Sequence, residues 1–152
     1  MTKHQVYLSL GSNLGQREEN LRKAIGLINE RVGEVVRQSS FIETEPWGFE
    51  SENQFVNAAV LVTTTLTPRQ VLKATQRIER QLGKTKAHAT ERTSPFTKYH
   101  DRPIDIDILL YDDLHIDTPQ LKIPHPLMQE RDFVMIPLRE IWITYADPEP
   151  SQ

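Results

Sequence analysis

The sequence contains no cysteine among its 152 residues. This absence excludes disulfides, thiolate nucleophiles and cysteine-based zinc sites, and it is compatible with a reducing cytosol. Long hydrophobic runs are missing too: the N-terminal run begins at Val6 and stops at Gly11. Such a run is too short for the core of a signal peptide or for a membrane span. We therefore expect a cytoplasmic protein with no membrane association.

An excess of positive charge is also lacking. The chain carries 18 Lys and Arg against 21 Asp and Glu, which gives a net charge of −3. A general nucleic-acid binder needs a basic excess to neutralise phosphates, so we expect no nucleic-acid partner. The length and a hydrophobic content of 38% fit one domain over residues 1–152, with a polar tail from about residue 146. We expect that domain to be a monomer.

Apolar periodicity and turn residues predict the order of the elements. An α+β fold is expected, with a ferredoxin-like core of order βαββαβ in which helices pack on an antiparallel sheet. Ser12 or Asn13 is expected to cap the first helix, and Thr67-Pro68 to start the second. The polar segment 84–101 is long for a loop, and we expect it to order when substrates bind. Strands are expected at 6–10, 35–44, 55–66, 104–111, 114–116 and 121–123, helices at 21–33 and 67–83, and short helical pieces at 127–138.

The most informative stretch runs from Arg102 to Tyr111. Ile104, Ile106, Ile108 and Leu110 recur with period two, which predicts a strand with these residues on one face and Asp105 and Asp107 on the other. Two carboxylates roughly 6–7 Å apart repel each other unless cations lie between them. Mg²⁺ is held by one or two carboxylates together with substrate phosphates, and Arg102 suits a phosphate as well. The alternative is a solvated polar face on a half-exposed strand.

Three further sets of residues suggest chemistry, each with a structural alternative. His125 lies between two prolines and could offer a stiff imidazole to a phosphate, or could belong to a surface turn. Phe55 and Asn57, with the loop at 44–48, could hold a flat heterocycle, or could be core and strand positions. Gln76, Glu79 and Arg80 share a helix surface that is typical of a solvated face. Lys84 and Lys86 could serve a triphosphate or simply solubilise a loop.

The glycines at 11–15 match no phosphate-binding pattern, so we interpret them as a strand-to-helix turn.

Taken together, these segments resemble the 6-hydroxymethyl-7,8-dihydropterin pyrophosphokinase family of folate biosynthesis. The resemblance extends from about Val6 to Leu138. The segments that carry it, in order, are LGSNLG at 10–15, FVNAAV at 55–60, QRIE at 76–79, RPIDIDIL at 102–109 and IPHP at 123–126.

The resemblance implies that the terminal diphosphate of ATP is transferred to the hydroxymethyl group of the pterin, with AMP as the other product. It implies two Mg²⁺ ions bridged by Asp105 and Asp107, and ATP as the co-substrate. The residues it assigns to catalysis are Arg102, Asp105, Asp107 and Lys84. Those it assigns to ATP are Gln76, Glu79, Lys86, Tyr99, Arg102, Ile108, His125 and Arg131, and those it assigns to the pterin are Thr44, Glu45, Trp47, Phe55, Asn57 and Phe133.

The chain departs from the family pattern in four places. Lys84 replaces an arginine, which keeps the charge but loses the planar fork of donors. Tyr99 falls where a loop tryptophan is usual, inside a segment that is longer than in better-known members. Gln120 and Lys122 also differ near the expected adenosine site.

Two other classes of function fit parts of the sequence. A Mg²⁺-dependent glycosyl- or nucleotidyltransferase would explain Asp105 and Asp107 but not Phe55 with Asn57. A non-catalytic ferredoxin-like module that binds RNA or a small regulator is disfavoured by the acidic charge and by the lack of an aromatic RNA-binding motif.

Overall fold

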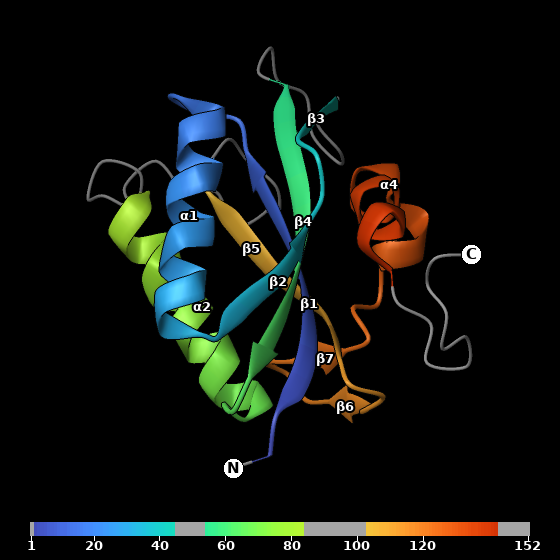
Figure 1. Ribbon diagram of the computed structural model, residues 1–152. Helices are drawn as coiled ribbons and strands as arrows, with labels where there is room; N and C mark the ends of the chain where they lie inside the picture. The colour runs from blue at the N-terminus through green and yellow to red at the C-terminus, as the bar shows by residue number, and fades with distance from the viewer. Residues whose placement is uncertain (1, 45–53, 84–102, 143–152) are drawn as a thin grey trace.

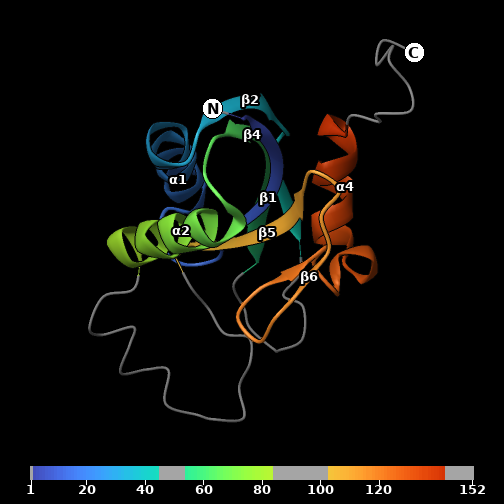
Figure 2. The ribbon, with the colours of Figure 1, turned by 90° about the horizontal axis from the view of Figure 1, so that it is seen from below.

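A central sheet with helices on both faces forms the fold (Figure 1). The computed structural model describes residues 2–44, 54–83 and 103–142. Helices α1 and α2 pack on one face of the sheet and α4 packs on the other, as the view from below also shows (Figure 2). The strands are β1 His4–Ser12, β2 Glu34–Gln38, β3 Ile42–Thr44, β4 Phe55–Thr64, β5 Asp105–Tyr111, β6 Ile116–Asp117 and β7 Lys122–Ile123, and the helices are α1 Arg17–Arg31, α2 Pro68–Leu82, the 3₁₀ turn η1 Met128–Glu130 and α4 Asp132–Ile141.

The strand order is β2-β4-β1-β5, with β3 paired to β4 and with β6 and β7 forming a separate two-stranded sheet. All the pairings in these sheets are antiparallel. The predicted α+β fold with a ferredoxin-like βαββαβ core is confirmed. No helix within the described ranges is long and apolar enough to cross a membrane.

The second helix begins as its sequence predicts, whereas the first does not. Thr67 accepts a hydrogen bond from the Gln70 amide, and the Gln70 side chain accepts one from the Thr67 amide, which makes a capping box before Pro68. The prediction that Ser12 or Asn13 caps α1 is wrong, because β1 continues to Ser12 and the cap position is Gln16.

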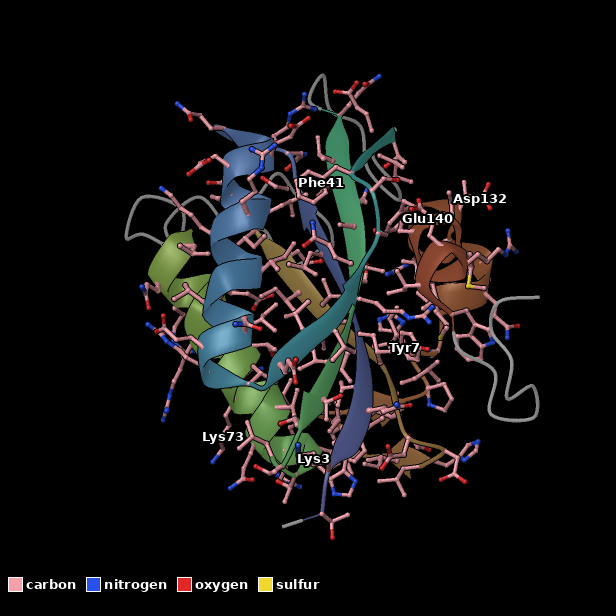
Figure 3. All side chains as sticks on the ribbon, viewed as in Figure 1. Lys3, Tyr7, Phe41, Lys73, Asp132 and Glu140 are labelled. Atoms are coloured by element: carbon pink, nitrogen blue, oxygen red, sulfur yellow. The ribbon has the colours of Figure 1, made fainter. Side chains whose placement is uncertain are left out.

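The second predicted strand is two strands separated by a short link at 39–41. The amide of Ser40 donates to Oε1 of Glu140 at 3.0 Å, and its hydroxyl donates to Oε2 at 2.7 Å. Glu140 belongs to α4, so these bonds tie the link to the helix on the other face of the sheet (Figure 3). Before the link the chain pairs with one part of β4 as β2, and after the link it pairs with another part of β4 as β3.

Two apolar clusters fill the two interfaces of the sheet. The larger lies under α1 and α2 and includes Leu8, Ile78 and Ile106. The smaller lies under α4 and includes Tyr7, Leu61, Leu109, Val134 and Leu138. Each cluster is supplied by alternate residues of the strands, as the period of a strand requires.

A β-bulge interrupts the alternation in β5. The register passes from Leu8 opposite Ile108 to Tyr7 opposite Leu110, which leaves Leu109 as the extra residue. Ile104, Ile106 and Ile108 are buried in the larger cluster as predicted. Leu110 packs against the smaller cluster instead, so its predicted place on the same face is wrong.

Candidate functional site

The candidate site lies on the same face of the sheet as α4, next to the residues against which α4 packs. On this face α4 and its neighbours cover Tyr7, Ala59, Leu61 and Leu109. Because side chains alternate, the same face continues toward the start of β4 and β5. The residues at those positions are Ser9 and Gly11 of β1, Phe55 and Asn57 of β4, and Asp105 and Asp107 of β5.

One lateral row of the sheet joins the two halves of the predicted site. Gly11 lies opposite Asn57 on one side and opposite Asp105 on the other. Asn57 and Asp105 are therefore two strands apart, roughly 10 Å, with only a glycine between them. A flat group held at Asn57 would thus lie beside the carboxylates of β5.

Asn57 is held in a fixed position. Its side chain is buried, and its Nδ2 atom donates to Oγ1 of Thr44 at 2.6 Å. A Cβ atom on Gly11 would come within 2.8 Å of the Asn57 Oδ1 atom and 3.3 Å of the Phe55 ring. The absence of a side chain at position 11 therefore lets the backbone of β1 approach both residues.

Asp105 and Asp107 project from the edge strand β5 on the same face, and both are half-buried. Within the described residues no group of three or more His, Cys, Asp or Glu side chains could hold a metal ion. Two carboxylate groups are nevertheless a fitting donor set for Mg²⁺, which commonly takes its other ligands from substrate phosphates and water. The residues present thus suit a metal that binds together with a phosphorylated substrate.

His125 lies close to the carboxylate pair. Its amide donates to the carbonyl of Leu109 at 3.0 Å, which fixes it against β5. Its Nδ1 atom accepts a bond from the Leu127 amide at 3.2 Å, so the neutral ring carries its proton on Nε2. Burial lowers the pKa of His125, Arg131 lowers it further, and Asp105 opposes both effects. A neutral imidazole with an Nε2–H donor is therefore favoured at neutral pH.

The lowered pKa predicts a pH-dependent stability. The folded state binds a proton on His125 less readily than the unfolded state, so stability is highest above the unfolded pKa and falls as pH drops through it. In urea titrations between about pH 7 and about pH 5, the free energy of unfolding should fall less in His125→Asn than in the original protein. Asparagine keeps an acceptor for the Leu127 amide. The exposed His115, replaced by Asn, is the control, and parallel curves for His125→Asn would contradict the prediction.

A pocket of about 260 Å³ lies on the edge of β5. Asp107, Ile108 and His125 line it, together with Leu72 of α2 and residues 119–122 around β7. In this pocket Ile108 and His125, which are predicted to bind the nucleotide, lie together with Asp107, a candidate metal ligand. Gln120 and Lys122, where the sequence departs from the family pattern, lie in the same wall.

The remaining predicted nucleotide residues are distributed differently. Glu79 is buried, and its Oε2 atom accepts a bond from the Ile106 amide at 2.7 Å, so the solvated-face interpretation is wrong for it. Gln76 is exposed on α2 and is not among the residues that line this pocket. Arg131 is buried, with its Cζ atom 5.5 Å from the centre of the Phe133 ring. The roles of these residues in binding stay predictions.

Six of the predicted site residues lie outside the described residues: Glu45, Trp47, Lys84, Lys86, Tyr99 and Arg102. The same holds for the predicted ordering of segment 84–101 and for the polar tail. The residues on either side of that segment are nevertheless adjacent, because a Cβ atom on Gly83 would lie 2.8 Å from Pro103. Gly83 and Pro103 therefore lie side by side near the start of β5.

Sequence reasoning missed Ser9 and Gly11. The glycine was interpreted as part of a turn, yet it lies inside β1 opposite Asn57. A glycine within a strand often marks the close approach of a ligand or of another group, and that signal was present in the sequence. Ser9 is buried opposite Asp107, and nothing in its local sequence distinguishes it.

Fold and site together define a class: a ferredoxin-like α+β protein with a carboxylate pair and an amide–aromatic wall on one open face of its sheet. The family described as 7,8-dihydro-6-hydroxymethylpterin-pyrophosphokinase (HPPK) matches residues 7–143. The chain belongs to this family.

Individual relatives agree with this assignment. A 2-amino-4-hydroxy-6-hydroxymethyldihydropteridine pyrophosphokinase of Porphyromonas gingivalis is 47% identical over 149 residues, covering 96% of this chain and 97% of the relative. A Bacillus subtilis protein of the same name is 43% identical, covering 90% of this chain and 77% of that protein. A crystal structure of a Plasmodium falciparum HPPK-DHPS triple mutant superposes with a TM-score of 0.70 at 16% identity, covering 92% of this chain and 40% of that one. The last similarity shows the fold alone.

Proposed function

We propose that this chain is a Mg²⁺-dependent pyrophosphokinase. It transfers the terminal diphosphate of ATP to the hydroxymethyl group of 6-hydroxymethyl-7,8-dihydropterin and releases AMP, a step of folate biosynthesis. The observation that carries the proposal is the lateral row formed by Asn57, Gly11 and Asp105. This row supports a role for the Asn57 amide in reading the edge of the ring and for the Asp105 carboxylate in binding a metal ion. Family membership and the names of the relatives support the same reaction.

On the pterin side, Asn57 presents an amide to the donor and acceptor edge of the ring. Thr44 fixes the orientation of that amide through the 2.6 Å bond. Phe55 lies against Gly11 and offers an aromatic face, and we assign the opposite face to Phe133 of α4. The loop residues Glu45 and Trp47 complete the proposed pterin site.

On the nucleotide side, Asp105 and Asp107 would hold two Mg²⁺ ions. These ions would neutralise the triphosphate and align the hydroxyl oxygen with the phosphorus that it attacks. His125 donates from Nε2 to a phosphate oxygen, and Ile108 lies at the open edge of β5 where the base can approach. We assign the remaining contacts to Gln76, Glu79, Arg131, Lys84, Lys86, Tyr99 and Arg102.

Transfer of this kind needs alignment and charge neutralisation more than covalent help from the protein. The hydroxyl oxygen forms a bond to the β-phosphorus of ATP, the bond between that phosphorus and the α,β-bridging oxygen breaks, and AMP leaves with that oxygen. The proton of the hydroxyl passes to solvent or to a phosphate oxygen. A cytoplasmic, monomeric, single-domain enzyme remains the expectation from the sequence.

One assay tests the proposal. The protein is incubated with ATP, Mg²⁺ and the hydroxymethyl dihydropterin, and the adenine nucleotides are separated. Pterin-dependent AMP is the expected product. ADP would point to an ordinary kinase, and the absence of turnover would favour a binding module.

The close approach of Gly11 to Asn57 predicts an effect on the pterin alone. In Gly11→Ala the new methyl group would lie 2.8 Å from the Asn57 Oδ1 atom, so the amide must shift from the position in which it binds Thr44. We expect the KM for the pterin to rise roughly tenfold, the loss of about one hydrogen bond, while the KM for ATP changes little. Gly26→Ala, at a position with no atom within 4 Å of the added Cβ, is the matched control. Equal increases in both KM values would contradict the prediction.

A further inference from the structure

Arg17 connects two separate parts of the chain. It is the first residue of α1, and its Nη1 atom donates to the backbone carbonyl of Gln54 at 2.7 Å. Its Nη2 atom makes an ion pair with Oε2 of Glu43, also at 2.7 Å. The Arg17 side chain is 33% exposed. One guanidinium group thus holds β3 and the start of β4 together from a third element.

The two partners of Arg17 adjoin the proposed pterin wall. Glu43 precedes Thr44, and Gln54 precedes Phe55. Thr44 and Phe55 are the last pair of the β3–β4 register. Arg17 therefore acts where the ladder ends, next to the residue that orients the Asn57 amide.

This end of the ladder needs an external support. β3 contains three residues and pairs with β4, so few backbone bonds hold it in register. If the strand end separates, the Thr44 hydroxyl leaves the Asn57 amide to which it is bound at 2.6 Å. The contacts of Arg17 oppose that separation from both strands at once.

The identity and position of the residue fit this role. A cation in the first turn of a helix is disfavoured by the helix dipole, and the next two residues, Glu18 and Glu19, follow the usual preference. Local conflicts of this kind tend to mark functional positions. The planar guanidinium offers two donors in fixed directions, which a lysine cannot do.

We propose that Arg17 is a positioning residue for pterin recognition: by bridging Glu43 and Gln54 it holds Thr44 and Phe55 in place and thereby fixes the Asn57 amide. The proposal rests on the proposed function, because the ligand of Asn57 is the pterin. It extends the site to a residue that makes no contact with the substrate itself.

The test begins with Arg17→Ala in steady-state assays of AMP formation. The KM for the pterin should rise five- to tenfold, and the KM for ATP should stay within twofold. Arg17→Lys should restore little of the loss, since the shorter lysine side chain lacks the planar fork whose two nitrogens meet the two partners. Arg31→Ala, an exposed arginine at the other end of α1, is the matched control.

The second arm is a double-mutant cycle with Glu43→Ala. If the two side chains act through one contact, the double variant should bind the pterin no more weakly than Arg17→Ala alone. Additive losses, or an unchanged pterin KM in Arg17→Ala, would overturn the proposal.

A third measurement separates this inference from the proposed function. The side-chain NH₂ resonances of Asn57 are followed by NMR without any ligand. They should shift or broaden in Arg17→Ala and stay unchanged in Arg31→Ala. Unchanged Asn57 resonances in Arg17→Ala would refute the positioning role even if AMP forms normally. If the original protein forms no AMP, the proposed reaction is refuted, and the positioning role is not. Thermal unfolding of each variant verifies that the fold is retained.

Discussion

Replacing Asp107 with asparagine is expected to lower kcat roughly a thousandfold, about 4 kcal/mol of transition-state stabilisation, at ordinary Mg²⁺ concentrations. The amide keeps the size of the side chain but loses the charge that holds a divalent cation. Asp107 lines the pocket at the edge of β5 and faces the same side as Asp105. The pterin affinity, measured without nucleotide, should be little changed.

The fold of Asp107→Asn should survive because the side chain is half-buried and lies outside both apolar clusters. Its circular dichroism and melting temperature should match those of the original protein. Asp113→Asn, in the exposed turn after β5, should retain full activity. An active Asp107→Asn enzyme would remove the basis for a metal at this position.

The second large effect is expected on the pterin side. In Asn57→Ala the KM for the pterin should rise roughly a hundredfold, because a site that reads a ring edge by hydrogen bonds loses its buried donor and acceptor. Asn57 is 2% exposed and its amide is held by Thr44. The KM for ATP should change little, since the pocket proposed for the nucleotide lies two strands away.

Asn29→Ala provides a matched control for this variant. Its side-chain amide is also hydrogen-bonded, since its oxygen accepts a bond from the Val35 amide at 2.9 Å, but it is exposed at the far end of α1. Both variants lose one side-chain hydrogen bond, so the comparison shows whether the loss of such a bond alone weakens pterin binding. Isothermal titration with the pterin should show weak binding for Asn57→Ala alone. Similar affinities for the two variants would exclude Asn57 from the pterin site.

Local sequence signals predicted much of the fold. The cap at Thr67, the proline that follows it and Gly83 mark α2 in the sequence, and the structure contains each of these features. Alternation in residues 104–108 predicts Asp105 and Asp107 on the face opposite Ile104, Ile106 and Ile108, as observed. These predictions succeeded because they depend on neighbours within a few residues.

Features that depend on distant partners escaped prediction. The bulge at Leu109 is a property of the pairing between β1 and β5, and the sequence of β5 alone does not predict it. The helix sequence predicts a solvated position for Glu79. This prediction is wrong because the partner of Glu79, the Ile106 amide, lies on another element. The roles of Gly11 and Arg17 likewise become visible only when β3, β4 and α1 are placed together.

The bulge also helps to form the pocket at the edge of β5. Leu109 is the extra residue of β5, and its carbonyl receives the His125 amide at 3.0 Å. The extra peptide unit of β5 therefore provides a hydrogen-bond acceptor for the segment that carries His125. Deleting Leu109 would restore strict alternation along β5, but it would also remove a buried side chain from the smaller apolar cluster. The deletion would also remove the carbonyl that binds the His125 amide. His125 would then lose its fixed position although no residue of its own segment had changed.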